Sequence, residues 1–128
     1  MIDVGLTAQV AHTTDGSSTA IAMGSGDVAV LATPKVVALV EEAAVAALAH
    51  VLGQGETSVG TTVDIEHLAP TPLGGSVTAM ATVSWVDQRR IGFDVVVRDD
   101  AKVVARGTHA RVIVDRDRFM ASAGVPAV

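Results

Sequence analysis

Three side chains in this sequence, Thr33, Glu41 and His67, belong to types that transfer protons and stabilise charge in active sites. A histidine can take up and return protons near neutral pH, because only its side chain titrates there when unperturbed. A carboxylate near a histidine can act in catalysis, and a hydroxyl can complete such a set. Each residue alone also has an ordinary structural explanation. Whether the three can act together depends on the helix and strands that position them.

Thr33 and Glu41 both fall in the segment Ala32–Leu52, the one long stretch with helical periodicity. At about 100° per residue, one face of this helix collects an apolar stripe. The stripe comprises Val36, Val37, Val40, Ala44, Leu48 and Val51. Glu41 falls inside it, between Leu48 and Leu52, where a carboxylate that nothing hydrogen-bonds costs free energy. Two interpretations stay open: an acid at the rim of the stripe with its head in water, or a catalytic carboxylate.

Local signals predict where this helix begins and ends. Thr33 has the side chain of a good N-cap, and Pro34 suits the first helical position, where its missing N–H is no loss. Gly53 and Gly55 are expected to end the helix. The first turn also offers unpaired N–H groups and the positive end of the helix dipole, which would suit a developing oxyanion.

The rest of the chain predicts strands from its period-two alternation and its turn residues. Four strands are expected after the helix, at about Ser58–Leu68, Gly75–Val86, Ile91–Val97 and Lys102–Val114. A first strand at Val4–Thr13 and a returning strand at Thr19–Met23 precede the helix. We therefore predict one α+β domain over residues 1–128, in which a curved antiparallel sheet wraps around a single central helix. The tail Met120–Val128 is expected to fray.

Composition limits the function further. The absence of cysteine excludes disulfides, thiolate nucleophiles and cysteine-ligated metals, and no histidine pair has metal-ligand spacing, so no metal site is expected. A net charge of −5, with only one tryptophan and two phenylalanines, argues against nucleic-acid binding. The sequence shows neither a signal peptide nor a membrane span, so a soluble cytoplasmic protein is expected.

Three sequence blocks carry a family resemblance: ATPKVVALVEEAA, SVGTTVDIEHLAPTPLGGSVTA and ARGTHARVIVDRDRF. Together they cover most of the chain from Leu31 to Phe119. On these blocks the sequence resembles the hotdog-fold thioesterases, and most closely the fluoroacetyl-CoA thioesterase group. The resemblance implies a hotdog fold and the hydrolysis of a short or small acyl-CoA thioester to the free acid and CoA. It implies no cofactor beyond the CoA of the substrate. A non-hydrolytic acyl-CoA-binding protein of the same fold is the alternative.

The resemblance also implies roles for five residues. Thr33, Glu41 and His67 match the catalytic positions of the family. Gly60 matches the glycine near the thioester carbonyl, and Arg111 matches the basic residue of the last strand, so both are expected to bind substrate. Cations for the CoA phosphates would come from the basic C-terminal half, with five candidates: Arg89, Arg90, Lys102, Arg106 and Arg111.

Two features affect what the resemblance implies. The family's two lid phenylalanines are matched here by Gly24 and Asp27, so selectivity for fluoroacetyl-CoA is not implied, and a different or broader short acyl group is expected. In one unbroken helix, Thr33 and Glu41 would also lie about 12 Å apart along the axis. Either the chain bends back near Pro34, or two subunits share the site. The resemblance to hotdog proteins implies a homodimer with sites at the subunit interface, which would allow the second arrangement.

Overall fold

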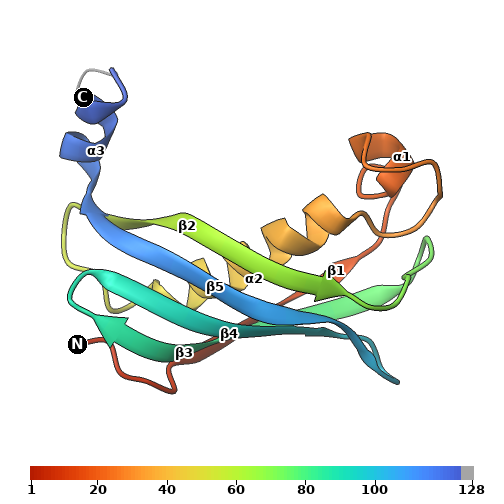
Figure 1. The fold of residues 1–128 in the computed structure, drawn as a ribbon, viewed down its shortest axis with the longest axis horizontal. Coiled ribbons are helices and arrows are strands. Elements are labelled where there is room, and N and C mark those ends of the chain that lie inside the picture. Colours follow the sequence, from red (N-terminus) through yellow and green to blue (C-terminus); the bar gives the residue numbers. More distant parts are fainter. Residues whose placement is uncertain (125–128) are drawn as a thin grey trace.

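The computed structural model describes residues 1–124. Its elements are β1 (Thr7–Thr13), α1 (Ala20–Met23), α2 (Thr33–Leu48), β2 (Glu56–His67), β3 (Ser76–Asp87), β4 (Arg90–Arg98), β5 (Val103–Asp115) and α3 (Arg116–Ser122). The strands form one antiparallel sheet in the order β1-β3-β4-β5-β2. Figure 1 shows this sheet curving along α2, with α1 and α3 at opposite ends of the molecule. The structure therefore has the predicted curved sheet and single long central helix.

Alternating side chains on β3 and β4 build the inner face of the sheet. The buried positions are Val77, Ala79, Ala81 and Val83 on β3, and Ile91, Phe93, Val95 and Val97 on β4. They pack against the buried face of α2, which comprises Val36, Leu39, Val40, Ala43, Ala44, Ala47 and Leu48. The alanines on this face let helix and sheet approach closely. The core thus fixes the position of α2 along its length. It thereby also fixes the residues on the side of α2 that faces away from the sheet.

Three sequence predictions about local structure were wrong. Residues Thr19–Met23 do not form a returning strand, because the Thr19 hydroxyl caps the short helix α1 by accepting a hydrogen bond from the Ala22 N–H at 3.2 Å. Thr33 is not an N-cap: Ala32 takes that position, α2 begins at Thr33, and no side chain caps it. The helix also ends at Leu48, before the predicted end at Leu52.

The C-terminal segment is more ordered than predicted. Helix α3 covers the first residues of the tail that we expected to fray, and the last four residues, 125–128, lie outside the described part of the chain. The Asp115 carboxylate caps α3 by accepting from the Arg118 N–H at 3.0 Å. This cap explains why a helix begins directly where β5 ends.

Strand β2 lies at one edge of the sheet and pairs with β5 alone among the described strands. Its register shifts between Gly60 and Thr62, which marks a β-bulge at the middle of the strand. The Thr61 hydroxyl donates to the Ala110 carbonyl at 3.1 Å across this bulge. A bulge changes the direction of the strand locally, and this one lies beside the open face of α2.

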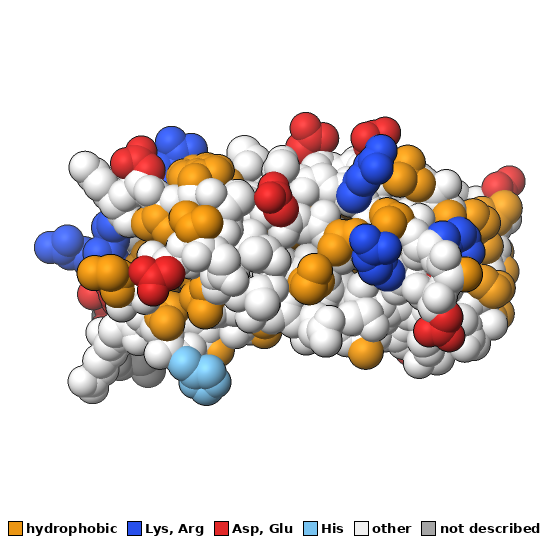
Figure 2. Space-filling view, turned by 90° about the horizontal axis from the view of Figure 1, so that it is seen from below, with side chains coloured by type: hydrophobic (Ala, Val, Ile, Leu, Met, Phe, Trp, Pro, Cys, Tyr) orange, Lys and Arg blue, Asp and Glu red, His pale blue; other side chains and the backbone are white. Residues whose placement is uncertain are grey.

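The surface seen in Figure 2 carries acidic and basic side chains interspersed with hydrophobic ones. Among the helices of residues 1–124, none combines the length and the apolar character needed to cross a membrane.

Candidate active site

The first turn of α2 meets the last residue of β2 through Thr33 and His67. The Thr33 Oγ1 atom lies 2.8 Å from His67 Nδ1, which is a hydrogen-bond distance. This hydroxyl is free to make the contact because Thr33 is the first helical residue and does not cap the helix. The structure thus brings together two of the three residues that the sequence predicts to be catalytic.

The environment of His67 favours a neutral imidazole. Burial of the ring lowers the pKa of His67 below its usual 6.5, and the Ala69 backbone offsets part of this effect. The Nε2 atom is buried and has no partner among the described residues. A neutral imidazole keeps a lone pair that can accept a proton from the Thr33 hydroxyl or from a water, so the pair has the composition of a hydroxyl with its general base.

A hollow of about 270 Å³ lies beside this pair. Besides Thr33 and His67 it is lined mainly by small and apolar residues: Ala20, Ser25, Gly26, Val28, Val30, Leu31, Leu68, Ala69 and Pro70. The two positions that match the family's lid phenylalanines, Gly24 and Asp27, are both exposed in the loop after α1. Neither carries an aromatic ring, and neither is among the residues that line the hollow.

Glu41 lies on the side of α2 that does not pack against the core. Its side chain is 40% exposed, and its Oε2 atom lies 3.3 Å from Arg111 Nη1 on β5. An open hollow of about 380 Å³ surrounds the carboxylate and is lined by Lys35, Ala38, Glu41, Glu42, Val45 and Arg111. The acid that the helical wheel places in the apolar stripe is therefore half-buried at its rim and paired with a cation.

Gly60 lies under the Glu41 carboxylate. A Cβ atom at Gly60 would collide with Glu41 Oε2, and it would lie only 3.3 Å from both Arg111 Nη1 and His109 Cε1. This crowding gives a physical reason for a glycine in the middle of β2, where glycine otherwise weakens a strand. Gly60, Glu41 and Arg111 therefore form a second cluster.

The two clusters are separate within one chain. Helix α2 is continuous from Thr33 to Leu48, so the chain does not bend back near Pro34, and that alternative was wrong. Thr33 and Glu41 are eight residues apart on this helix, which corresponds to about 12 Å along its axis. One protomer therefore presents the Thr33–His67 pair and the Glu41 cluster at two different positions along α2.

Sequence reasoning missed two residues of the second cluster, His109 and Ser58. Arg111 Nε donates to the Ser58 hydroxyl at 2.8 Å, and Arg111 Nη1 lies 3.2 Å from His109 Nε2. His109 and Arg111 are two apart on β5 and so share one face of the strand, a spacing that the sequence does show. Nothing local to Ser58 indicates the contact, because it depends on how β2 and β5 pair.

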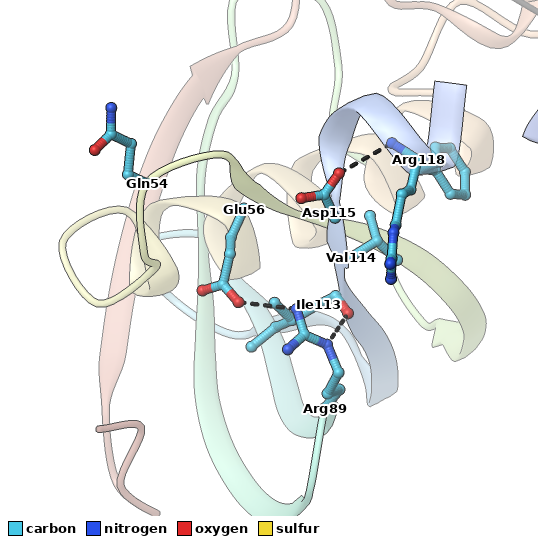
Figure 3. Close-up of a pocket in the computed structure, with 8 residues that line it drawn as sticks. Gln54, Glu56, Arg89, Ile113, Val114, Asp115 and Arg118 are labelled. Carbon is cyan, nitrogen blue, oxygen red and sulfur yellow. Dashed lines mark hydrogen bonds and ion pairs between the residues drawn. The ribbon is translucent and has the colours of Figure 1, made fainter. Parts of the chain in front are cut away.

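Most of the predicted CoA-binding cations already have partners in the chain. A hollow of about 680 Å³ lies near α3, and Figure 3 shows Arg89 in it between the Glu56 carboxylate at 2.8 Å and the Ile113 carbonyl at 2.9 Å. Lys102 pairs with Asp99 at 2.8 Å, and Arg90 lies over the Trp85 ring. This hollow contains none of the predicted catalytic residues.

Comparison with known proteins identifies the family. Residues 14–117 match the sequence model of a family described as fluoroacetyl-CoA-specific thioesterase. The chain belongs to this family. A curated fluoroacetyl-CoA thioesterase from Streptantibioticus cattleyicolor is 38% identical over 92 residues, which is 72% of this chain and 66% of that protein. The chain thus spans just under two thirds of this curated member of the thioesterase family.

Solved structures agree with this assignment. A variant of the fluoroacetyl-CoA thioesterase in complex with acetyl-CoA superposes with a TM-score of 0.90 at 29% identity, over 96% of this chain and 97% of that one. A hot-dog-like protein from Thermanaerovibrio acidaminovorans superposes with a TM-score of 0.88 at 27% identity, over 96% and 91% of the two chains. The predicted resemblance and the predicted hotdog fold are both confirmed, and the match supports the predicted thioester hydrolysis.

Proposed function

We propose that this protein is an acyl-CoA thioesterase that hydrolyses a short or small acyl-CoA to the free acid and CoA. The observation that carries the proposal is the 2.8 Å contact between the Thr33 hydroxyl and a His67 imidazole whose pKa burial lowers. This pair borders a hollow lined mainly by apolar side chains, in a chain that belongs to a thioesterase family. No cofactor takes part, and CoA enters as part of the substrate.

His67 acts as the general base in this mechanism. Neutral imidazole takes a proton from the attacking water while the water oxygen bonds to the thioester carbon. The tetrahedral intermediate then collapses, the C–S bond breaks, and the imidazolium returns the proton to the leaving CoA thiolate. Thr33 holds the ring in place through its 2.8 Å contact with Nδ1.

Glu41 supplies a carboxylate, and the backbone near Gly60 or the first turn of α2 supplies N–H donors. The carboxylate stabilises the imidazolium that forms during the reaction, or it attacks the carbonyl carbon. In the second case the C–S bond breaks, CoA leaves as the thiolate, and water then cleaves the short-lived mixed anhydride. The N–H donors receive the negative charge that develops on the carbonyl oxygen. Arg111 lies beside Glu41, and we propose that it helps to bind the substrate there.

We further propose that the active site forms between two copies of the chain. In a homodimer, Thr33 and His67 of one protomer would meet Glu41, Gly60 and Arg111 of the other. Three observations support this arrangement: α2 is unbroken, Glu41 lies in an open hollow, and the neighbouring Val45 is 48% exposed. A second protomer covering this side of α2 would bury Val45 and enclose the carboxylate.

The acyl group is proposed to be small and apolar, and not restricted to fluoroacetyl. The hollow beside Thr33 and His67 has valine, leucine and proline side chains in its wall and no charged residue among those that line it. With Gly24 and Asp27 at the two lid positions, no aromatic side chain selects for the fluoromethyl group there.

A free-thiol release assay over a panel of acyl-CoAs tests the function. Wild type should release thiol from at least one short acyl-CoA well above the buffer rate, and His67→Ala and Glu41→Gln should each lower kcat by roughly 100-fold or more. Asp87→Asn is the control, because Asp87 is an exposed acid at the end of β3 that lines neither hollow, so loss of its charge should leave the rate unchanged. Binding of acyl-CoA without thiol release across the panel would instead identify a non-hydrolytic binding protein.

A further inference from the structure

Strand β5 carries two buried polar side chains, His109 and Arg111, next to each other and close to Glu41. His109 is 2% exposed and Arg111 is 6% exposed, and because they are two residues apart they point to the same face of the strand. The His109 ring stacks on Phe93 of β4, with ring centroids 5.9 Å apart and an interplanar angle of 25°. A buried guanidinium next to a buried imidazole is tolerated only if the imidazole is uncharged.

The two contacts of His109 require the same neutral tautomer. A guanidinium has donors only, so His109 Nε2, 3.2 Å from Arg111 Nη1, must accept a hydrogen bond. The hydrogen of the neutral ring is then on Nδ1, which donates to the Thr62 carbonyl at 2.7 Å. Burial lowers the pKa of His109, the Thr62 backbone offsets part of this, and the Arg111 charge lowers it further. The ring is therefore neutral near neutral pH.

The guanidinium of Arg111 is held by three groups before it reaches Glu41. Its Nε donates to the Ser58 hydroxyl at 2.8 Å, its Nη2 donates to the Ser58 carbonyl at 3.0 Å, and its Nη1 donates to His109. A planar group with this many fixed contacts has one orientation. In that orientation Nη1 also faces Glu41 Oε2 at 3.3 Å, on the side of the cluster that is open to solvent.

Gly60 leaves the space in which these groups meet. The Glu41 carboxylate, Arg111 Nη1 and His109 Cε1 all lie close to the point where a Cβ atom of Gly60 would stand. One arrangement thus comprises Gly60 on β2 and, on β5, the neutral His109 ring and the Arg111 guanidinium. Its outermost member is the carboxylate to which the proposed mechanism assigns a role.

We propose that His109 is a positioning residue of the active site. As a neutral hydrogen-bond acceptor it fixes Arg111, together with Ser58, so that Nη1 is directed at the Glu41 carboxylate and holds it over Gly60. His109 is buried and acts on the reaction only through Arg111 and Glu41. The inference rests on the proposed function, because the role of Glu41 in thioester hydrolysis is proposed there.

Two substitutions separate positioning from packing. His109→Leu fills a similar volume and removes the acceptor, whereas His109→Gln keeps a side-chain oxygen that can accept from Arg111. We expect His109→Leu to lower kcat about tenfold, with KM changed less than about twofold. His109→Gln should retain most of the wild-type kcat. Equal losses in both variants would overturn the proposal, because packing and not the acceptor would then be responsible.

A double-mutant cycle with Glu41→Gln tests the route of the effect. If His109 acts through Glu41, His109→Leu should have no further effect on the residual kcat of Glu41→Gln, although each single variant lowers the rate. Losses that multiply in the double variant would show that His109 affects the reaction by another route and would overturn the proposal.

Nitrogen-15 NMR of the full chain tests the arrangement without any activity. The His109 ring should show the Nδ1-protonated neutral tautomer at pH 7.5, because its two contacts require that tautomer and its pKa lies below the usual 6.5. The Nη–H signals of Arg111, whose Nη1 donates to His109, should be protected from exchange in wild type and His109→Gln, and less protected in His109→Leu. A protonated ring or an Nε2–H tautomer would overturn the proposal, whereas these signals in a protein that releases no thiol would overturn only the proposed function.

Discussion

The Glu41 carboxylate occupies the space that a side chain at Gly60 would need. This relationship joins a half-exposed acid on α2 to the bulged middle of β2, and it places the acid beside Arg111. Glu41 is thereby held between a strand and a cation, although the helix that carries it leaves it partly open to solvent. The position of the carboxylate depends on a residue that has no side chain.

Gly60→Ala should therefore affect activity more than stability. The colliding atom is the end of a flexible glutamate side chain, which can move away at little cost, so the free energy of unfolding should change by less than about 1 kcal/mol. The displaced carboxylate should lower kcat roughly 10- to 100-fold, since misplacement by about 1 Å can cost that much. Steady-state thiol release and urea denaturation measure the two quantities.

Gly107→Ala is the contrasting control. A Cβ at Gly107 would collide with the backbone carbonyl of Asp64 on the paired strand, and backbone in a sheet cannot move aside as a side chain can. We expect this variant to lose about 2 kcal/mol or more of stability through overpacking. If Gly60→Ala were destabilised as much as Gly107→Ala, the claim that Gly60 serves the position of Glu41 would be wrong.

Thr33→Val should separate a catalytic hydroxyl from a structural one. Because Thr33 does not cap α2, removing its hydroxyl should cost less than about 1 kcal/mol of stability, while the loss of its contact with His67 should lower kcat roughly tenfold or more. Thr19→Val provides the comparison, because the Thr19 hydroxyl does cap a helix and its loss should cost about 1 kcal/mol without a specific effect on kcat. Thermal unfolding and thiol release of both variants test this contrast, and an unchanged kcat in Thr33→Val would contradict it.

The sequence predicted the long elements well and the short ones poorly. The periodicity of α2 and of the four strands after it extends over enough residues for the pattern to show which face is buried. Residues 19–23 are too few for this, and a threonine followed by small apolar residues suits a strand as well as a capped helical turn. Thr33 had the chemistry of an N-cap, but backbone conformation placed Ala32 there.

The candidate site was predicted by residue type more than by geometry. The family resemblance and the position of Glu41 in the apolar stripe both indicated this residue. Neither showed that its nearest cation, Arg111, is fixed by Ser58 and a neutral His109. Those contacts join strands that are far apart in sequence, and the register of β2 on β5 decides them. The helical wheel also placed Glu41 in the apolar stripe without showing that this side of α2 faces an open hollow.

Stability should decrease as the pH falls from 7.5 to 5.5, because burial lowers the pKa of both His67 and His109. Between the usual pKa of 6.5 and the lowered folded values, the unfolded chain binds more protons than the folded one, so acid favours unfolding. The stabilisation is fully present above pH 6.5 and is lost as the pH falls through the folded values. Urea denaturation at several pH values measures the loss. His109→Gln removes one of the two groups and should make the dependence shallower, whereas an unchanged slope would contradict the assignment.

Complementation between two inactive variants tests whether the active site is shared. His67→Ala and Glu41→Gln each disable every site in their own homodimers. If His67 of one protomer works with Glu41 of the other, a mixed dimer contains one site with both mutations and one site with neither. Mixing the two variants in equal amounts under conditions that allow subunit exchange should then restore about a quarter of the wild-type rate, since about half of the dimers are mixed and each has one intact site. If both residues of a site come from the same chain, the mixed dimer has no intact site and the rate stays at that of the single variants.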